Sequence, residues 1–157
     1  MNTLRRQLII SSVFAALALS ARGAQSPSAV EVWTAPGCGC CHDWVKHLEA
    51  NGFRVTVHDG GNTDARARLG MPVRLGSCHT AEVGGYAIEG HVPAREIRRL
   101  LKERPQAVGL AVPAMPRGSP GMDGPVYNGQ HDPYDVLLVE RGGGARVYQA
   151  YRGGSGL

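Results

Sequence analysis

The chain has 157 residues, of which 43% are apolar, 19% are charged and 22 are glycines, a composition that suits one folded domain and excludes a largely disordered chain. The formal net charge is +4, but three of the 17 basic residues lie among the first 23 residues, which contain no acidic residue. Residues 24–157 therefore carry 14 basic and 13 acidic side chains, and so balanced a surface excludes general binding to nucleic acid.

The first 23 residues have the three-part pattern of an export signal. A basic start is followed by a mostly apolar run over 8–19, and Ala21 and Gly23 supply small residues for a cleavage site. The apolar run is too short for a bilayer, which needs a helix of about 20 residues. We expect residues 1–23 to be removed after Sec or twin-arginine export, which leaves 24–157 in the periplasm without stable membrane insertion. An uncleaved membrane anchor is the alternative.

The next part of the chain alternates between strand and helix patterns. Cys41, Trp44, Val45 and Leu48 share one helix face, and His47 falls on the opposite, exposed side. Gly84-Gly85 between two apolar segments predicts a β-hairpin. In chain order we expect a strand at 30–34, a helix from 41 to about 50, a strand at 53–58, a short helix at 64–69, hairpin strands at 80–83 and 86–89, and a helix from Pro93 to before Pro105.

This order predicts an α/β fold with a thioredoxin-like or glutaredoxin-like core over 30–104. The remaining residues, 105–152, form a Gly/Pro-rich extension, because nine of the 21 residues from Pro113 to Pro133 are proline or glycine and exclude a regular element there. Strand patterns at 136–140 and 146–151 flank three glycines and predict a final β-hairpin. We expect residues 24–157 to form a single domain.

Three of the four cysteines lie at the N-terminus of the first predicted helix, as Cys38, Cys40 and Cys41. Backbone N–H groups and the helix dipole favour thiolates at such a position. Cys38 and Cys41 have the C-x-x-C spacing, which can close a disulfide or chelate a soft metal ion. Cys40 offers a competing disulfide partner, but it adds a ligand for several soft ions. A purely structural disulfide remains an alternative.

A second set of candidate ligands lies further along the chain. Cys78 and His79 come directly before the hairpin, where a thioredoxin-like fold faces its C-x-x-C turn, so we expect Cys78 beside the first three cysteines. His91 precedes the last core helix, and Met115 and Met122 lie in Gly/Pro loops where no packing period explains them. Imidazole and thioether groups are copper ligands. The alternatives are a buried free thiol at Cys78 and methionines that only cover the core.

The same segment permits a different cofactor. Cys38-Gly39-Cys40-Cys41-His42 matches C-x-x-C-H, the attachment motif of c-type haem, with Met71, Met115 or Met122 as an axial ligand. The strand–loop–helix context and the presence of only two phenylalanines argue against a haem pocket.

At these residues the chain resembles the CopG-type copper-resistance family, long described only as a domain of unknown function. The resemblance covers about residues 29–152 and is carried by four segments, Trp33–Cys41, Ser77–Thr80, Gly85–Ala94 and Gly109–Met122. It implies a periplasmic thioredoxin-like protein that binds a multinuclear copper cluster through C-x-C-C and a distal cysteine, with interconversion of Cu(I) and Cu(II) as a further activity. His42 departs from the family, in which lysine is common at this position.

Together these observations predict an exported copper-binding protein of copper resistance whose partners are copper ions and other periplasmic copper-handling proteins. Several copper ions, as Cu(I) and in part Cu(II), would be bridged by the cysteines. The predicted ligands are Cys38, Cys40, Cys41, Cys78, His79, His91, Met115 and Met122. The alternative is a thiol-disulfide oxidoreductase in which Cys38 attacks and Cys41 resolves; a c-type haem protein is the third. Whether the chain is an enzyme, acting on copper or on thiols, is left open.

Overall fold

The computed structural model describes residues 28–153, so the predicted export segment lies outside the described residues. Within this range no helix combines the length and the apolar character needed to cross a membrane. The elements in chain order are β1 (Ala29–Thr34), α1 (Gly39–Ala50), β2 (Arg54–His58), α2 (Thr63–Arg68), η1 (Val73–Leu75), β3 (His79–Val83), β4 (Tyr86–Glu89), α3 (Ala94–Glu103), β5 (Ala107–Ala111), η2 (Pro125–Tyr127), β6 (Tyr134–Glu140) and β7 (Ala145–Tyr151).

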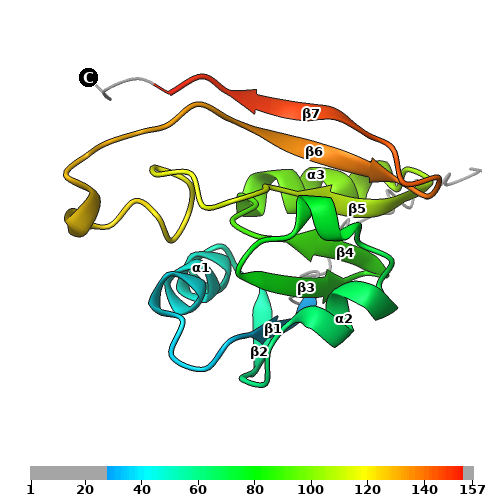
Figure 1. Ribbon diagram of the computed structural model, residues 1–157, viewed down its shortest axis with the longest axis horizontal. Coiled ribbons are helices and arrows are strands. Elements are labelled where there is room, and N and C mark those ends of the chain that lie inside the picture. Colours follow the sequence, from blue (N-terminus) through cyan, green and yellow to red (C-terminus); the bar gives the residue numbers. More distant parts are fainter. Residues whose placement is uncertain (1–27, 154–157) are drawn as a thin grey trace, which may run out of the picture.

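Seven strands form one mixed sheet in the order β2-β1-β3-β4-β5-β6-β7 (Figure 1). β1 pairs with β2 in parallel through the crossover helix α1, and β3 and β4 form the predicted antiparallel hairpin. The segment β2-β1-β3-β4, followed by α3, is the thioredoxin-like arrangement expected from the sequence. The α/β fold class is therefore confirmed, as are the two strands of the final hairpin.

Apolar side chains pack on both faces of the sheet. One cluster joins Trp44 and Leu48 of α1 to Ile97 and Leu100 of α3 against strand residues such as Ile88. A smaller cluster on the other face contains neighbouring strand residues, including Ala87 and Ala111 beside Met71 and Leu75. Alternation along each strand thus divides its side chains between two layers. The predicted apolar face of α1 is buried as expected.

The structure contains a strand, β5, that is not expected from the sequence. Its five residues begin two positions after Pro105 and have a glycine at the centre, which hides the strand pattern. Gly109 is required there by close packing, since a Cβ at this position would collide with the carbonyl oxygen of Ala87 on β4. β5 pairs in parallel with β4 and antiparallel with β6, and Leu110 and Val112 are fully buried. The sheet therefore continues without a break from the predicted core into the predicted extension.

The loop between β5 and β6 runs back to the N-terminal end of α1, as its yellow segment shows in Figure 1. Gly121 permits this contact. Its φ is +84°, and an added Cβ would lie 2.6 Å from the carbonyl oxygen of Cys40 and 2.7 Å from the backbone nitrogen of Trp44. The loop thereby lies directly against the cysteine-bearing turn.

His47 corrects an expectation drawn from periodicity. It is not a free surface residue, because its Nε2 accepts a hydrogen bond of 3.1 Å from the backbone N–H of Ala94, the first residue of α3. α3 has no capping side chain of its own, so a neighbouring helix supplies one. Burial lowers the pKa of His47, which favours the neutral ring that can accept this bond.

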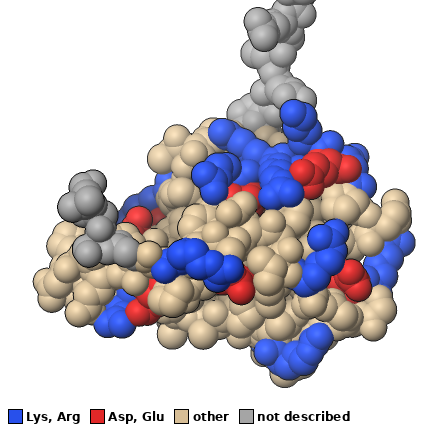
Figure 2. Space-filling view, turned by 90° about the horizontal axis from the view of Figure 1, so that it is seen from above, with Lys and Arg blue, Asp and Glu red and all other residues tan. Residues whose placement is uncertain are grey.

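Basic and acidic side chains are interspersed on the surface. In the view from above, lysine and arginine gather along one side with acidic side chains among them (Figure 2). On α3, Arg99 pairs with Glu103 at 2.8 Å and Arg95 pairs with Glu96 at the same distance. The basic face of this helix is therefore partly neutralised, as the balanced charge of the chain suggests.

Candidate metal centre

The turn before α1 brings its cysteines together because the backbone folds back on Cys38. Cys38 has an extended backbone conformation, and its carbonyl accepts hydrogen bonds of 3.2 Å from the N–H groups of Cys41 and His42. Cys38 and Cys41 form a disulfide, with Cys38 half-buried and Cys41 fully buried. Cys40 is a free thiol, with its sulfur 3.7 Å from that of Cys38. The C-x-x-C pair thus closes a disulfide and leaves a third sulfur beside it.

Cys78 completes a cluster of four sulfurs. The sulfurs of Cys38, Cys40, Cys41 and Cys78 all lie within 4.8 Å of one another. The expected position of Cys78 in front of the loop is therefore observed. Burial, and then the neighbouring Cys40, raise the pKa of Cys78 to about 11. This thiol therefore keeps its proton at neutral pH, and a bound metal ion would displace it.

Cys78 also belongs to a second group, with His79 and His91, whose ligand atoms lie within 4.8 Å of one another. Nε2 of His91 is 3.1 Å from the Cys78 sulfur, and Nδ1 is 2.8 Å from the carbonyl oxygen of Pro120. Because a carbonyl only accepts, Nδ1 carries the hydrogen and Nε2 directs its lone pair at the sulfur. The β5–β6 loop thus sets the tautomer that leaves a metal-binding nitrogen facing Cys78.

Both imidazoles are fully buried. Burial lowers the pKa of His91, and burial together with the nearby His91 lowers the pKa of His79 to about 3. Nδ1 of His79 is 3.4 Å from the Cys78 sulfur, while its Nε2 has no hydrogen-bond partner among the described residues. A buried nitrogen without a partner is costly, and a neutral imidazole is the form that binds metal ions.

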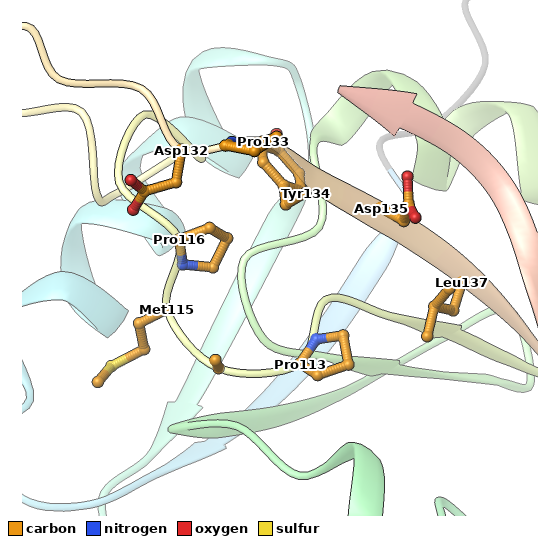
Figure 3. Close-up of a pocket in the computed structure, with 9 residues that line it drawn as sticks. Pro113, Met115, Pro116, Asp132, Pro133, Tyr134, Asp135 and Leu137 are labelled. Atoms are coloured by element: carbon orange, nitrogen blue, oxygen red, sulfur yellow. The ribbon is translucent and has the colours of Figure 1, made fainter. Parts of the chain in front are cut away.

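The two methionines differ in their surroundings. Met122 is buried, and its sulfur accepts a hydrogen bond of 3.1 Å from the Tyr127 hydroxyl. Met115 is 50% exposed and lines a cavity of about 440 Å³ that Cys78 also lines. It also borders a cavity of about 490 Å³ formed by prolines, Tyr134 and acidic residues, which contains no cysteine or histidine (Figure 3). Met115 is thus placed near Cys78, whereas Met122 has a partner of its own.

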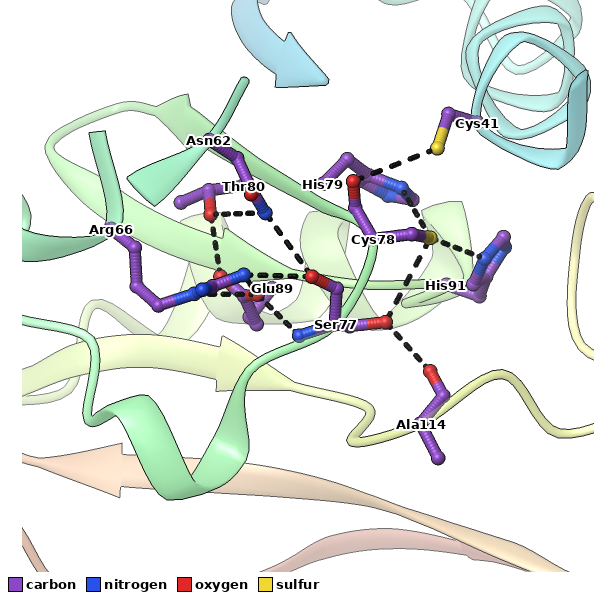
Figure 4. Close-up of polar contacts among 10 residues, drawn as sticks. All are labelled: Cys41, Asn62, Arg66, Ser77, Cys78, His79, Thr80, Glu89, His91 and Ala114. Atoms are coloured by element: carbon purple, nitrogen blue, oxygen red, sulfur yellow. Dashed lines mark hydrogen bonds and ion pairs between the residues drawn. The ribbon is translucent and has the colours of Figure 1, made fainter. Parts of the chain in front are cut away.

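The polar residues around Cys78 are not evident from the sequence. Glu89 ends β4 and is fully buried, where it pairs with Arg66 of α2 (Figure 4). A glutamate at the end of an otherwise apolar strand was the available signal, because a buried carboxylate requires a cation or several donors. Its partner, 23 residues earlier, could not be read from any local pattern.

The chain is similar to one described protein family and to two solved structures. A family described as "Protein of unknown function, DUF411" matches residues 75–122. The solved structure named "Copper resistance protein copG- Form 1" is 48% identical, with 81% of this chain and 99% of that chain covered and a TM-score of 0.74. "Copper resistance protein copG- Form 2" is also 48% identical, with 80% and 98% covered and a TM-score of 0.73. No curated protein matches the chain.

Proposed function

The chain belongs to the family of copper resistance protein CopG, and we propose that it is an exported copper-binding protein that holds Cu(I) in a cysteine-bridged site. The observation that carries the proposal is the group of four cysteine sulfurs within 4.8 Å of one another. Thiolates are soft ligands that suit Cu(I), and one thiolate can bridge two ions. Cys78 belongs to both ligand groups, which supports more than one copper ion per chain.

The nitrogen ligands extend the range of copper states that the site can hold. Neutral imidazoles suit Cu(II) better than thioethers do, and His79 and His91 both lie beside Cys78. We propose that these residues allow Cu(I) and Cu(II) to be held at neighbouring positions. Met115 and Met122 are additional candidate ligands for Cu(I).

The disulfide between Cys38 and Cys41 represents the oxidised form of this site. A thiol reductant opens it by supplying two electrons and two protons, and the resulting thiols lose their protons when they bind copper. In the oxidised form Cys40 and Cys78 are the remaining free cysteines of the described chain. Full copper loading is therefore proposed to require the reduced protein.

The same disulfide favours a second candidate function, thiol-disulfide exchange. Cys38 is the more exposed partner and Cys41 is fully buried, as expected for an attacking and a resolving cysteine.

The variant Cys40→Ser separates the two functions. If the cysteines hold copper, this change removes a soft ligand and lowers the copper bound per chain, because a hydroxyl binds Cu(I) weakly. If the protein exchanges disulfides, the variant keeps or gains activity, because Cys38 and Cys41 remain and a competing thiol is lost. The measurements are copper per chain under reducing, anaerobic conditions and reduction of insulin disulfides. Unchanged copper together with strong reductase activity would overturn the copper proposal.

Export to the periplasm is part of the proposal and depends on residues 1–23. The mature protein is expected to begin near Ala24, which N-terminal sequencing of the exported protein checks.

A further inference from the structure

Cys78 lies in a segment without regular secondary structure. Residues 76–78 lie between η1 and β3, outside the helices and strands. Yet the Cys78 sulfur lies 3.1 Å from Nε2 of His91 and within 4.8 Å of three other sulfurs. Because a ligand sulfur must be placed within a fraction of an ångström, other contacts have to hold this backbone.

Side chains from two elements hold the residue before it, Ser77. Its backbone N–H donates to Oε1 of Glu89 at 2.6 Å. Its carbonyl oxygen, which belongs to the same peptide unit as the nitrogen of Cys78, accepts from Arg66 at 2.7 Å and from Asn62 at 3.1 Å (Figure 4). The peptide groups on both sides of Ser77 are therefore fixed by Arg66 of α2, by Asn62 directly before that helix, and by Glu89 of β4.

Glu89 and Arg66 form a buried ion pair with two hydrogen bonds between them. Two guanidinium nitrogens of Arg66 reach Oε1 of Glu89 at 3.0 and 2.8 Å, and the Thr80 hydroxyl donates to Oε2 at 2.7 Å. The Glu89 side chain is 0% exposed and that of Arg66 13% exposed. A buried ion pair adds little net stability compared with apolar side chains, but its hydrogen bonds are directional. Its evident effect here is to define the position of Ser77.

We propose that Arg66 and Glu89 are positioning residues that hold the Ser77–Cys78 peptide so that the Cys78 sulfur faces the other three cysteines and His91. Neither residue belongs to the candidate ligand groups, so both act through the backbone of Ser77. The expected effect on copper binding rests on the proposed copper function, but the placement of Cys78 can be measured without copper.

The test compares Glu89→Gln with a matched control, Glu96→Gln. Glu96 is an equally buried carboxylate, hydrogen-bonded by Arg95 at 2.8 Å and by the Tyr151 hydroxyl at 3.0 Å, but it lies on α3. The double variant Arg66→Met/Glu89→Leu removes both charges together, which keeps the interior apolar if the single change prevents folding.

The first measurement uses reduced, metal-free protein and follows alkylation of each cysteine by iodoacetamide with mass spectrometry. We expect Cys78 to react faster in Glu89→Gln and in the double variant than in the wild type, with Cys40 unchanged as an internal reference. The second measurement is retention of Cu(I) against a competing chelator, which should weaken by about 10–100-fold, as for other residues that orient a ligand. Glu96→Gln should match the wild type in both.

An unchanged alkylation rate at Cys78 in Glu89→Gln and in the double variant would overturn the inference. An equal change in Glu96→Gln would overturn it as well. Should the wild type retain no copper while Cys78 still becomes more reactive in the variants, the copper function fails and the positioning role stands. The two proposals are thus tested separately.

Discussion

His79 is a residue whose chemistry follows from complete burial. In the folded protein its pKa is lowered to about 3, whereas in an unfolded chain a histidine titrates near its ordinary pKa of about 6.5. The unfolded state therefore binds more protons than the folded state between these pH values. The contribution of His79 to the free energy of unfolding is thus complete above pH 6.5 and is lost as the pH falls toward 3.

We expect the free energy of unfolding of the metal-free protein to fall with decreasing pH over this range, by as much as about 1.4 kcal/mol per pH unit from this residue. His91 acts in the same direction. The variant His79→Leu removes the contribution of residue 79, so its stability should depend less steeply on pH. Urea denaturation of both proteins between pH 6.5 and 4 measures the two slopes, and parallel slopes would contradict the assignment of a buried neutral imidazole.

A site residue can be predicted from the sequence when the topology of the fold places it next to another site residue. Cys78 was expected beside the cysteine turn because it precedes the hairpin strand, and the sulfurs do lie together. The pairing of Arg66 with Glu89 was not predicted, because it depends on how α2 packs against β4. Periodicity identifies which side of an element is apolar, but not which buried polar groups meet across it.

At the level of elements, α3 depends on α1 for its N-terminal cap. His47→Ala removes the acceptor for the Ala94 N–H and should lower the free energy of unfolding by about 1 kcal/mol, the usual effect of losing a cap. Lys46→Ala is the matched control, since Lys46 neighbours His47 on α1 and is exposed. Chemical denaturation measures both, and equal stabilities of the two variants would show that the cap is unimportant.

The elements with clear patterns were predicted well, whereas β5 was not. Helix α1 and the hairpin β3–β4 carry periodic apolar residues, a stop signal or a glycine turn, and these local features suffice. β5 is short, and Gly109 weakens its apolar pattern. That glycine is explained only by the nearness of β4, which is a contact between segments about 20 residues apart.

At the scale of the whole molecule, the sheet links the thioredoxin-like segment to the remainder of the chain. β5 pairs directly with β4, and Leu110, Val136 and Leu138 belong to the same apolar cluster as Val30 of β1 and Ile97 of α3. Ending the chain after residue 104 would expose this cluster along the edge of β4.

We therefore expect residues 24–104 alone not to fold cooperatively, in contrast to residues 24–157. Removal of the extension would also take away the Pro120 carbonyl that orients His91. Far-UV circular dichroism during urea titration of both chains measures this. A cooperative transition in the shorter chain would show that the thioredoxin-like segment is independent of the extension.

The third sulfur of the cysteine turn has a consequence for any preparation of the protein in air. With Cys40 only 3.7 Å from the Cys38 sulfur, its thiolate can attack the Cys38–Cys41 bond, form a Cys38–Cys40 bond and release the Cys41 thiolate. The products are isomers of identical mass, so intact-mass analysis cannot distinguish them. Oxidised samples would therefore be heterogeneous although they have one molecular weight, and only peptide mapping under acidic conditions, which stop the exchange, would resolve the forms.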